Sequence, residues 1–571
     1  MKDMEFALIF LFCIAYWKYG DWLVGSFSDP YKMTLAVALI VFGLVLFVVA
    51  AHYVEKALNE IRKWRNGTRT LSERPRIQFP FYDFPLDTVM ADFNCDAANR
   101  ECTFLGLNAE RNNKEVVKVA DEDRCKGLHV LGISGSGKST FFESLIVQDA
   151  IKNRPIIIID AKGEMSFINR IHALLASVGR GDDLLIFSLS HPNLSCSYNP
   201  FFAGECDPQI IIDSFFDNYL DDNTFFRESA RVIFTHSYHI LHSLSRYFTP
   251  LDVYTYMTND ECREEINSKI QDGNSQGTMH LQLMNQIIRD LTDQYRGWKH
   301  VITGFNNFLM DFSMDLLNQA DSDIILEDCV RQRKIVYFQL PTNAYPNQAV
   351  NIARLVQSNI RYISSLIQLG KIPKDTLISV NVDEYASLAD KRYKYLFSMG
   401  RSSWIMTTIA HQSLSDLEEI SETFKKGVDH NTLNKIYLKQ RDAELCDAIA
   451  KDIGTYMTNL PTTRMGAGLF GVQKSIGEVS YRPTNEFHFP PDRIRKLHPY
   501  GQGYYINSAN DSYTCINLGR FNEIEPLPYT KRTKLDKKSG MGLFEKYYRR
   551  SAKPSSRKKR KTTIGQVEFD D

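Results

Sequence analysis

The sequence predicts an α/β protein with a mostly parallel sheet, an inserted all-helical domain and an N-terminal membrane anchor of two helices. Three observations carry this prediction: apolar strand patterns that alternate with helical patterns, one long stretch with helical spacing only, and two apolar segments near the N-terminus. With 43% hydrophobic and 24% charged residues, the 571-residue chain has the composition of a globular protein of two or three domains.

The strand pattern is clearest at Ile156–Asp160, where four isoleucines precede a carboxylate. Such unbroken β-branched runs are typical of parallel strands that are covered on both faces. Between residues 207 and 316 the strand pattern is absent and apolar residues recur at helical spacing, which predicts the inserted helical domain. A Gly-rich stretch at 461–471 predicts a loop. Further strands are predicted at 184–189, 335–340, 377–382 and 405–409, and helices at 347–369 and 443–453.

Two segments near the N-terminus predict a transmembrane hairpin. Residues 33–54 carry no formal charge, and as a helix they would span about 33 Å, enough for a hydrocarbon core of about 30 Å. Residues 4–25 are also apolar, with Trp17 and Trp22 placed like interfacial aromatics, and a cleaved signal peptide is the alternative reading. Basic residues follow the second span, so the positive-inside rule places both termini in the cytoplasm.

A phosphate-binding loop follows the apolar run Leu128–Leu131. The stretch Gly132–Thr140 has the pattern GxxxxGK[ST], whose glycines let backbone N–H groups approach phosphate oxygens at a helix N-terminus. Lys138 is expected to reach the β and γ phosphates, and the Ser139 hydroxyl to ligate Mg²⁺. The sequence therefore predicts ATP and Mg²⁺ as ligands. The predicted nucleotide-binding residues are Gly132, Ile133, Ser134, Gly135, Ser136, Gly137, Lys138, Ser139 and Thr140.

Two adjacent carboxylates, Asp383 and Glu384, end the predicted strand 377–382. Asp383 is expected to bind Mg²⁺, and Glu384 is placed to accept a proton from an attacking water. An acidic pair at a strand end, combined with the phosphate loop, favours hydrolysis over transfer to another substrate. The alternative reading is a solvated strand end followed by a helix cap.

Two further patterns argue against metal and disulfide chemistry elsewhere. His236, His239 and His242 follow one another at spacings of three, which turns each about 60° from the last around a helix, and no carboxylate or cysteine completes a ligand set. They are interpreted as surface or core-edge histidines rather than metal ligands. The chain's 10 cysteines include no CxxC pair, which argues against a zinc module or a disulfide framework.

The residues after the acidic pair complete a recognisable arrangement. After the acidic pair come an arginine that follows a glycine (Gly400–Arg401), a strand and then Gln412–Ser413. This order of motifs resembles that of the type IV secretion coupling proteins, the TraD and TraG kind of membrane-anchored conjugation ATPase. Residues 160–164 (DAKGE) are close to that family's DPKGE motif, with Ala161 in place of its proline. The resemblance covers about residues 125–521.

The resemblance implies roles for individual residues. Arg401 resembles the arginine finger that enters a neighbouring subunit's site, which can contribute about 10³ to 10⁵ in turnover. Gln412 resembles the polar sensor near the γ-phosphate. Asp160 and Lys162 match the family motif, with a structural ion pair as the alternative role. The implied catalytic residues are thus Lys138, Glu384, Arg401 and Gln412, and the implied metal-binding residues are Ser139 and Asp383.

The expected organisation combines these features. The ranges are a transmembrane hairpin at 1–55, a membrane-proximal linker with strands at 56–124, a first part of the nucleotide-binding domain at 125–206, a helical domain at 207–316, a second nucleotide-binding part at 317–530 and a disordered basic tail with an acidic end at 531–571. The tail's basic residues could attract DNA or anionic lipid, and its acidic end could hook a relaxosome protein. A merely solubilising end is the equal alternative.

The resemblance also implies a function. A RecA-like core would assemble as a homo-hexamer beneath the bacterial inner membrane, with the ATPase domain in the cytoplasm and the two spans in contact with membrane lipids. It would couple relaxase-bound single-stranded DNA, and protein effectors as a further cargo, to the components of a type IV secretion channel. Two alternatives remain: a nucleotide-gated docking receptor with little motor activity, and a related chromosome or repair DNA translocase.

Overall fold

The fold is known from a computed structural model. It describes residues 82–84, 101–111, 113, 115–201, 207–219, 222–245, 247–271, 275–294, 297–374, 376–389, 397, 400, 402–467, 473–521 and 524–530. All of these belong to the second of two compact units, which begins at Phe79. The predicted spans at 4–25 and 33–54, Arg401 and the tail at 531–571 lie outside the described residues. Within those residues, no helix combines the length and the apolar character needed to cross a membrane.

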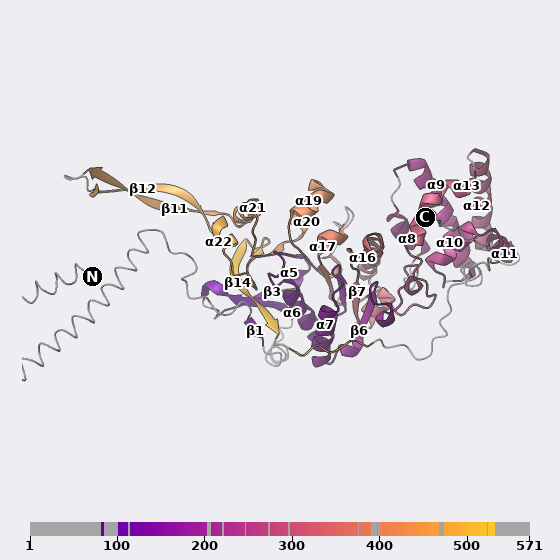
Figure 1. Ribbon diagram of the computed structural model, residues 1–571, viewed down its shortest axis with the longest axis horizontal. Coiled ribbons are helices and arrows are strands. Elements are labelled where there is room, and N and C mark those ends of the chain that lie inside the picture. Colours follow the sequence, from indigo (N-terminus) through magenta and orange to yellow (C-terminus); the bar gives the residue numbers. More distant parts are fainter. Residues whose placement is uncertain are drawn as a thin grey trace, which may run out of the picture. The chain divides into compact units, whose positions relative to one another are not determined.

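A twisted sheet forms the centre of the described part of the chain, where its strands number 12 (Figure 1). The run β10–β4–β9–β8–β5–β7–β6 is parallel throughout. The predicted α/β class with a mostly parallel sheet is therefore confirmed. These strands are β4 (Leu128–Leu131), β5 (Ile156–Asp160), β6 (Leu184–Ser188), β7 (Ile335–Gln339), β8 (Ile378–Asp383), β9 (Ile405–His411) and β10 (Asn434–Leu438).

An antiparallel extension continues the sheet beyond β10. In order it adds β13, β14, β2 and β3, each antiparallel to the strand before it, while β1 pairs with β14 in parallel. The pairing of β14 with β2 brings together segments about 400 residues apart, such as Asn517 and Leu107. The bounds are β1 (Tyr82–Phe84), β2 (Cys102–Asn108), β3 (Val116–Ala120), β13 (Gln502–Asn507) and β14 (Ser512–Phe521).

Helices cover both faces of the parallel strands (Figure 1). Ile156 and Ile158 of β5 pack in one core with residues of α6 and α7. Ile157 and Ile159 point to the other face and share a second core with residues of α16. Burial on both faces explains why this strand has no alternating polar positions. The helices are α6 (Lys138–Ile151), α7 (Met165–Ser177) and α16 (Pro346–Gln368).

Shorter helices fill the connections between strands. The α-helices are α5 (Asp121–Arg124), α15 (Leu326–Arg331), α17 (Tyr385–Leu388), α19 (Ser415–Ile420), α20 (Glu422–Asn431), α21 (Ala443–Ile453) and α22 (Pro491–Arg495). The 3₁₀-helices are η2 (Ala109–Arg111), η3 (Gly181–Asp183), η4 (Pro192–Leu194) and η5 (Asp315–Leu317).

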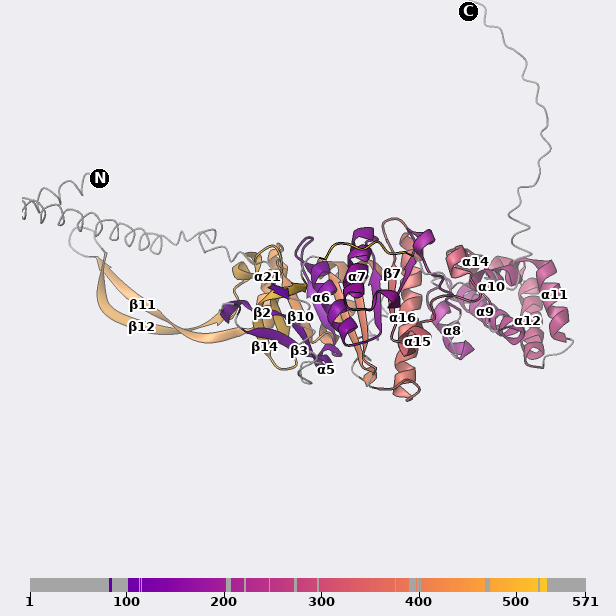
Figure 2. The same cartoon turned by 90° about the horizontal axis from the view of Figure 1, so that it is seen from below.

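The chain between β6 and β7 forms a helical cluster of its own (Figure 2). Its interior is aromatic: the rings of Phe234 and Phe305 have centroids 5.0 Å apart, and those of Phe215 and Phe234 are 5.5 Å apart. Asn351 of α16 donates a hydrogen bond to Asp311 at 3.1 Å and so ties this cluster to the sheet domain. The helices are α8 (Pro208–Phe216), α9 (Thr224–Leu244), α10 (Pro250–Thr258), α11 (Asp260–Gln271), α12 (Ser275–Gln294), α13 (Trp298–Val301) and α14 (Thr303–Met310).

A long β-ribbon replaces part of the predicted loop at 461–471. Strands β11 (Thr455–Ala467) and β12 (Gln473–Phe487) pair antiparallel, so the loop prediction is wrong for residues 461–467. Pairing with a complementary segment outweighs the weak local strand propensity of glycine and proline. A two-stranded ribbon also leaves alternate N–H groups on its open edges, where a proline removes no ladder bond.

A buried ion network joins α5, which follows β3, to α6 and to the residues directly after α6. Arg124 makes a bidentate contact with Asp149, at 2.8 and 3.0 Å, and Arg154 also donates to Asp149 at 2.9 Å. Arg154 and Lys152 both contact Asp121. Burial disfavours the charged carboxylate of Asp149, but the two guanidinium groups outweigh it and hold its pKa well below the usual range.

We expect Asp149→Ala to lower the free energy of unfolding by about 3–5 kcal/mol, because it leaves two buried guanidinium groups without their shared partner. Urea denaturation followed by circular dichroism would measure the shift. Asp447→Ala, at an exposed position of α21, is the matched control and should change stability by less than about 0.5 kcal/mol. Equal midpoints for the two variants would contradict this account of the network.

Candidate nucleotide-binding site

Three strands of the parallel sheet end at the same edge and position the residues of the candidate site. Strand β4 leads into the phosphate loop, β8 ends at Asp383 and β5 ends at Asp160. Asp160 is the register partner of Asp383, so these two strands finish level with each other. The carboxyl ends of parallel strands are where open α/β sheets bind ligands.

The phosphate loop depends on glycines for its shape. Gly135 and Gly137 have φ angles of 74° and 103°, in the left-handed region that favours glycine. A Cβ atom at Gly132 would lie 2.5 Å from Ser136 Oγ and 2.8 Å from Leu438 Cβ. Helix α6 then begins at Lys138 without a side-chain cap on its first N–H groups. These uncapped N–H groups are suited to anion binding.

Lys138 lies within this cradle and is only 4% exposed. Its Nζ donates to the carbonyl oxygens of Gly132 at 2.6 Å and Ile133 at 3.3 Å. Burial disfavours the ammonium form and lowers the pKa of Lys138 below its usual value. A phosphate group in the loop would supply the negative charge that these neutral carbonyl groups do not.

The acidic pair lies opposite the start of α6. Ser139 Oγ donates a hydrogen bond to Asp383 Oδ2 at 3.3 Å, and Gln412 Nε2 donates to Glu384 Oε1 at 3.3 Å. Glu384 has a φ angle of 49°, a left-handed conformation that is strained for a residue with a side chain. Its backbone N–H donates to Asp383 Oδ1 at 2.9 Å, which stabilises this turn.

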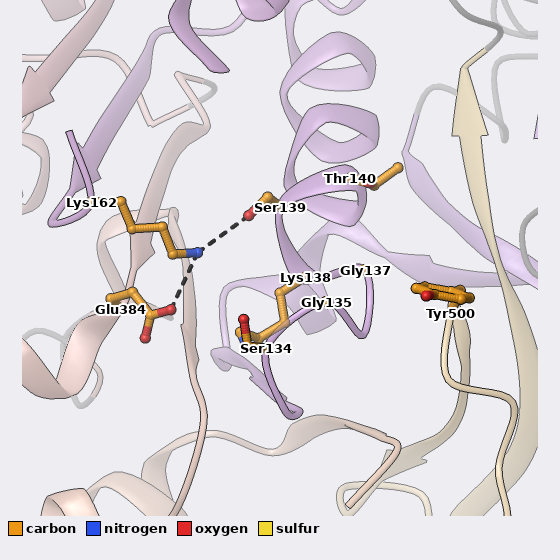
Figure 3. Close-up of a pocket in the computed structure, with 9 residues that line it drawn as sticks. All are labelled: Ser134, Gly135, Gly137, Lys138, Ser139, Thr140, Lys162, Glu384 and Tyr500. Atoms are coloured by element: carbon orange, nitrogen blue, oxygen red, sulfur yellow. Dashed lines mark hydrogen bonds and ion pairs between the residues drawn. The ribbon is translucent and has the colours of Figure 1, made fainter. Parts of the chain in front are cut away.

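Lys162 joins the same cluster from the loop after β5 (Figure 3). Its Nζ lies 2.9 Å from Asp383 Oδ2 and 3.2 Å from Glu384 Oε1. Burial opposes the ammonium form, but the attraction of the two carboxylates outweighs it and raises the pKa of Lys162. The sequence left open whether Lys162 has a role in the site, and the structure brings it there.

Asp160 has a different position from the other acidic residues. Its Oδ2 accepts a hydrogen bond from the Tyr337 hydroxyl at 2.7 Å, and its Oδ1 accepts one from the Lys162 backbone N–H at 2.9 Å. Burial raises the pKa of Asp160 above its usual value. The contacts of Asp160 therefore fix the loop that carries Lys162.

A pocket of about 210 Å³ opens between the phosphate loop and these polar groups. Tyr500 forms one wall, with its side chain facing the pocket opposite Lys162 and Glu384 (Figure 3). The Gly501 N–H donates to the Ser136 carbonyl at 2.9 Å, which fixes this wall to the phosphate loop. The lining residues are Ser134, Gly135, Gly137, Lys138, Ser139, Thr140, Lys162, Glu384 and Tyr500.

Sequence reasoning missed Tyr500, which lies beyond the strongly patterned strands. The only local signal was the glycine pair Gly501 and Gly503 directly after it. Of the predicted site residues, the structure brings Lys138, Ser139, Asp383, Glu384 and Gln412 together. Arg401 lies outside the described residues.

The donor set fits a nucleotide with a magnesium ion. Ser136 Oγ is buried without a hydrogen-bond partner among the described residues, in a loop built for phosphate. The hydroxyl and carboxylate oxygens of Ser139 and Asp383 are ligands of the kind that Mg²⁺ prefers. No group of three or more His, Cys, Asp or Glu side chains in the described part of the chain could hold a metal ion by itself.

The histidines of the helical domain form a separate group. His236 Nδ1 lies 3.0 Å from His280 Nδ1, and the ring of His239 stacks on that of His280 with centroids 4.3 Å apart. His242 instead stacks on Tyr238, with centroids 6.2 Å apart. Burial lowers the pKa values of His236, His239 and His280, which favours neutral rings in contact with one another.

Comparisons by sequence find a family model and a relative that are similar to parts of this chain. Residues 378–499 match the family model described as the TraM recognition site of TraD and TraG. The type 4 coupling protein DotL of Legionella pneumophila is 20% identical over 423 residues, which is 63% of this chain. The chain is similar to type IV coupling proteins. The family resemblance predicted from the sequence is therefore confirmed. The chain spans about half (53%) of the length of DotL.

Solved coupling-protein structures share the fold. The bacterial conjugative coupling protein TrwB in complex with sulphate has a TM-score of 0.52 at 13% identity, covering 76% of this chain and 96% of that one. TrwB in complex with the ATP analogue ADPNP has a TM-score of 0.51 at 13% identity, covering 76% and 97%. At this identity the likeness concerns the fold alone. The matched family segment contains Asp383, Glu384 and Gln412.

Proposed function

We propose that this chain is an ATPase of a type IV secretion system. The observation that carries the proposal is that Ser139 and Glu384 line the phosphate-loop pocket and that Asp383 lies beside them, with Ser139 Oγ 3.3 Å from Asp383 Oδ2. A phosphate loop alone fits many nucleotide-binding proteins. A carboxylate pair at the end of a neighbouring strand adds a metal ligand and a proton acceptor.

The residues divide the chemistry between them. The loop N–H groups and Lys138 bind the phosphates, and Ser139 and Asp383 would hold Mg²⁺. The bound ion would neutralise charge that develops on the phosphate oxygens. Glu384 accepts a proton from the attacking water, and Gln412 orients its carboxylate through their 3.3 Å hydrogen bond.

The proposal extends to assembly and cargo. A homo-hexameric ring would sit at the cytoplasmic side of the bacterial inner membrane, anchored among its lipids by the spans at 4–25 and 33–54. Arg401 would complete the neighbouring subunit's site. The match to the TraM recognition model supports a relaxosome protein as a partner. Relaxase-bound single-stranded DNA, protein effectors and the secretion channel would be the other partners.

A nucleotide-gated docking receptor and a related DNA translocase remain as alternatives. The presence of Glu384 at the pocket, with Gln412 hydrogen-bonded to it, favours a hydrolysing enzyme over a receptor, since docking alone requires neither a proton acceptor nor its orienting partner. Similarity to the coupling protein DotL favours a secretion role over chromosome transport. Stimulation of ATP hydrolysis by single-stranded DNA would favour a motor. A lack of such stimulation in an assembled ring would favour the receptor.

The general-base role of Glu384 predicts the behaviour of Glu384→Gln. Hydrolysis should fall about 10²- to 10⁴-fold while ATP still binds, because the amide cannot accept the proton. Phosphate release and fluorescent-nucleotide binding would be measured side by side. Glu444→Gln, at an exposed position of α21, serves as the control. Unchanged hydrolysis in Glu384→Gln would refute this catalytic assignment.

Tyr500 should contribute to binding the base of the nucleotide. Its side chain is 53% exposed and lines the pocket, and stacking on an aromatic ring is worth about 1–3 kcal/mol per base. Tyr500→Ala is expected to weaken ATP binding about tenfold or more but to leave tripolyphosphate binding unchanged, and Tyr500→Phe should retain both. Calorimetric titrations would test this, with Tyr247→Ala, 50% exposed in the helical domain, as the control. An equal loss for both ligands would contradict stacking.

A further inference from the structure

Lys162 occupies the centre of the oxygen cluster described above. Its Nζ lies 2.9 Å from Asp383 Oδ2, 3.2 Å from Glu384 Oε1 and 3.4 Å from Ser139 Oγ. Two of these contacts appear as dashed lines in Figure 3. Two of the same oxygens, those of Ser139 and Asp383, are the groups that fit a magnesium ion. The ammonium group and the metal therefore depend on the same partners.

The backbone around Lys162 is fixed, whereas its side chain is flexible and is held by the three polar contacts of its ammonium group. Asp160 accepts a hydrogen bond from the Lys162 N–H, and Gly163 turns with a φ angle of 80° beside Pro341, which a Cβ would approach to 2.8 Å. The Lys162 side chain is 30% exposed, and its flexible four-carbon stem has no fixed geometry of its own. Displacement of its ammonium group thus needs no rearrangement of the loop.

We propose that Lys162 is the counter-ion of the metal-free site and a gate against bare Mg²⁺, an inference that rests on the proposed function. A divalent ion at Ser139 and Asp383 would repel the nearby ammonium group and take its oxygen partners. Without a nucleotide, Lys162 would then keep only Glu384 of its two carboxylate partners. When ATP arrives with the metal, its phosphates enter the pocket that Lys162 lines and provide new acceptors for the ammonium group.

Metal entry is therefore coupled to nucleotide entry through one side chain. The gate disfavours a site that is filled by metal alone, and it leaves the complete metal–nucleotide pair favourable. A purely structural ion pair would behave differently, because its removal would weaken the fold without making the site more attractive to a cation.

Manganese binding to the full chain tests this proposal. Electron paramagnetic resonance of free Mn²⁺ would be recorded for wild type, Lys162→Met, Lys162→Gln and Lys162→Arg without nucleotide. Both neutral variants should bind bare Mn²⁺ about tenfold more tightly or better, because affinity rises with the net negative charge of the ligand set. Lys162→Arg keeps the charge and should match wild type. Lys299→Met removes a surface ion pair with Asp260 and is the control.

A second readout separates the gate from a structural role. Without metal, the melting temperature of Lys162→Met should be lower than that of wild type. Addition of Mn²⁺ should raise the melting temperature of Lys162→Met by more than it raises that of wild type. Equal or weaker affinity for bare Mn²⁺ in both neutral variants would overturn the gate, while nucleotide binding by wild type would leave the proposed function intact. Failure of wild type to bind ATP with Mn²⁺ would overturn both.

Discussion

Parallel pairing of β4, β9, β8 and β5 is the constraint on which the site depends. It makes these segments end at one edge of the sheet, with Leu131 level with His411 and Asp160 level with Asp383. Helices pack against both faces of these strands, so a shift by one residue would exchange the side chains that each face presents and disrupt both packed layers. Packing far from the pocket therefore positions the Asp383 carboxylate beside the Ser139 hydroxyl.

The second determinant is charge balance at that edge. Asp383, Glu384 and Asp160 lie close together. Lys162 contacts both Asp383 and Glu384, which also accept hydrogen bonds from Ser139 and Gln412, respectively. Asp160 instead accepts hydrogen bonds from the Tyr337 hydroxyl and a backbone N–H. Lys138 is held back on the loop carbonyls. Neighbouring carboxylates repel one another, and a nearby ammonium group offsets that repulsion. The positions of Lys138 and Lys162 therefore govern which charged ligands the site accepts.

The parts of the site that have local signals could be predicted from the sequence. A pattern of about ten residues is enough to predict the function of Gly132–Thr140 and of the apolar strand that ends in Asp383. The isoleucine run likewise predicts a buried parallel strand. Tyr500 could not be found in this way, because it reaches the pocket through the pairing of β13 with β10 and a hydrogen bond from Gly501 to the phosphate loop. The β11–β12 ribbon was missed for the related reason that pairing, not local propensity, decides it.

The central claim is that Ser139, Asp383 and the phosphate loop form one magnesium-dependent nucleotide site. Calorimetric titration of a non-hydrolysable ATP analogue into the full chain, with and without Mg²⁺, tests it most directly in wild type and Asp383→Asn. The account predicts one binding event per chain that Mg²⁺ strengthens about tenfold or more in wild type but not in Asp383→Asn. Equal strengthening by Mg²⁺ in the two proteins, or no binding by wild type, would contradict it.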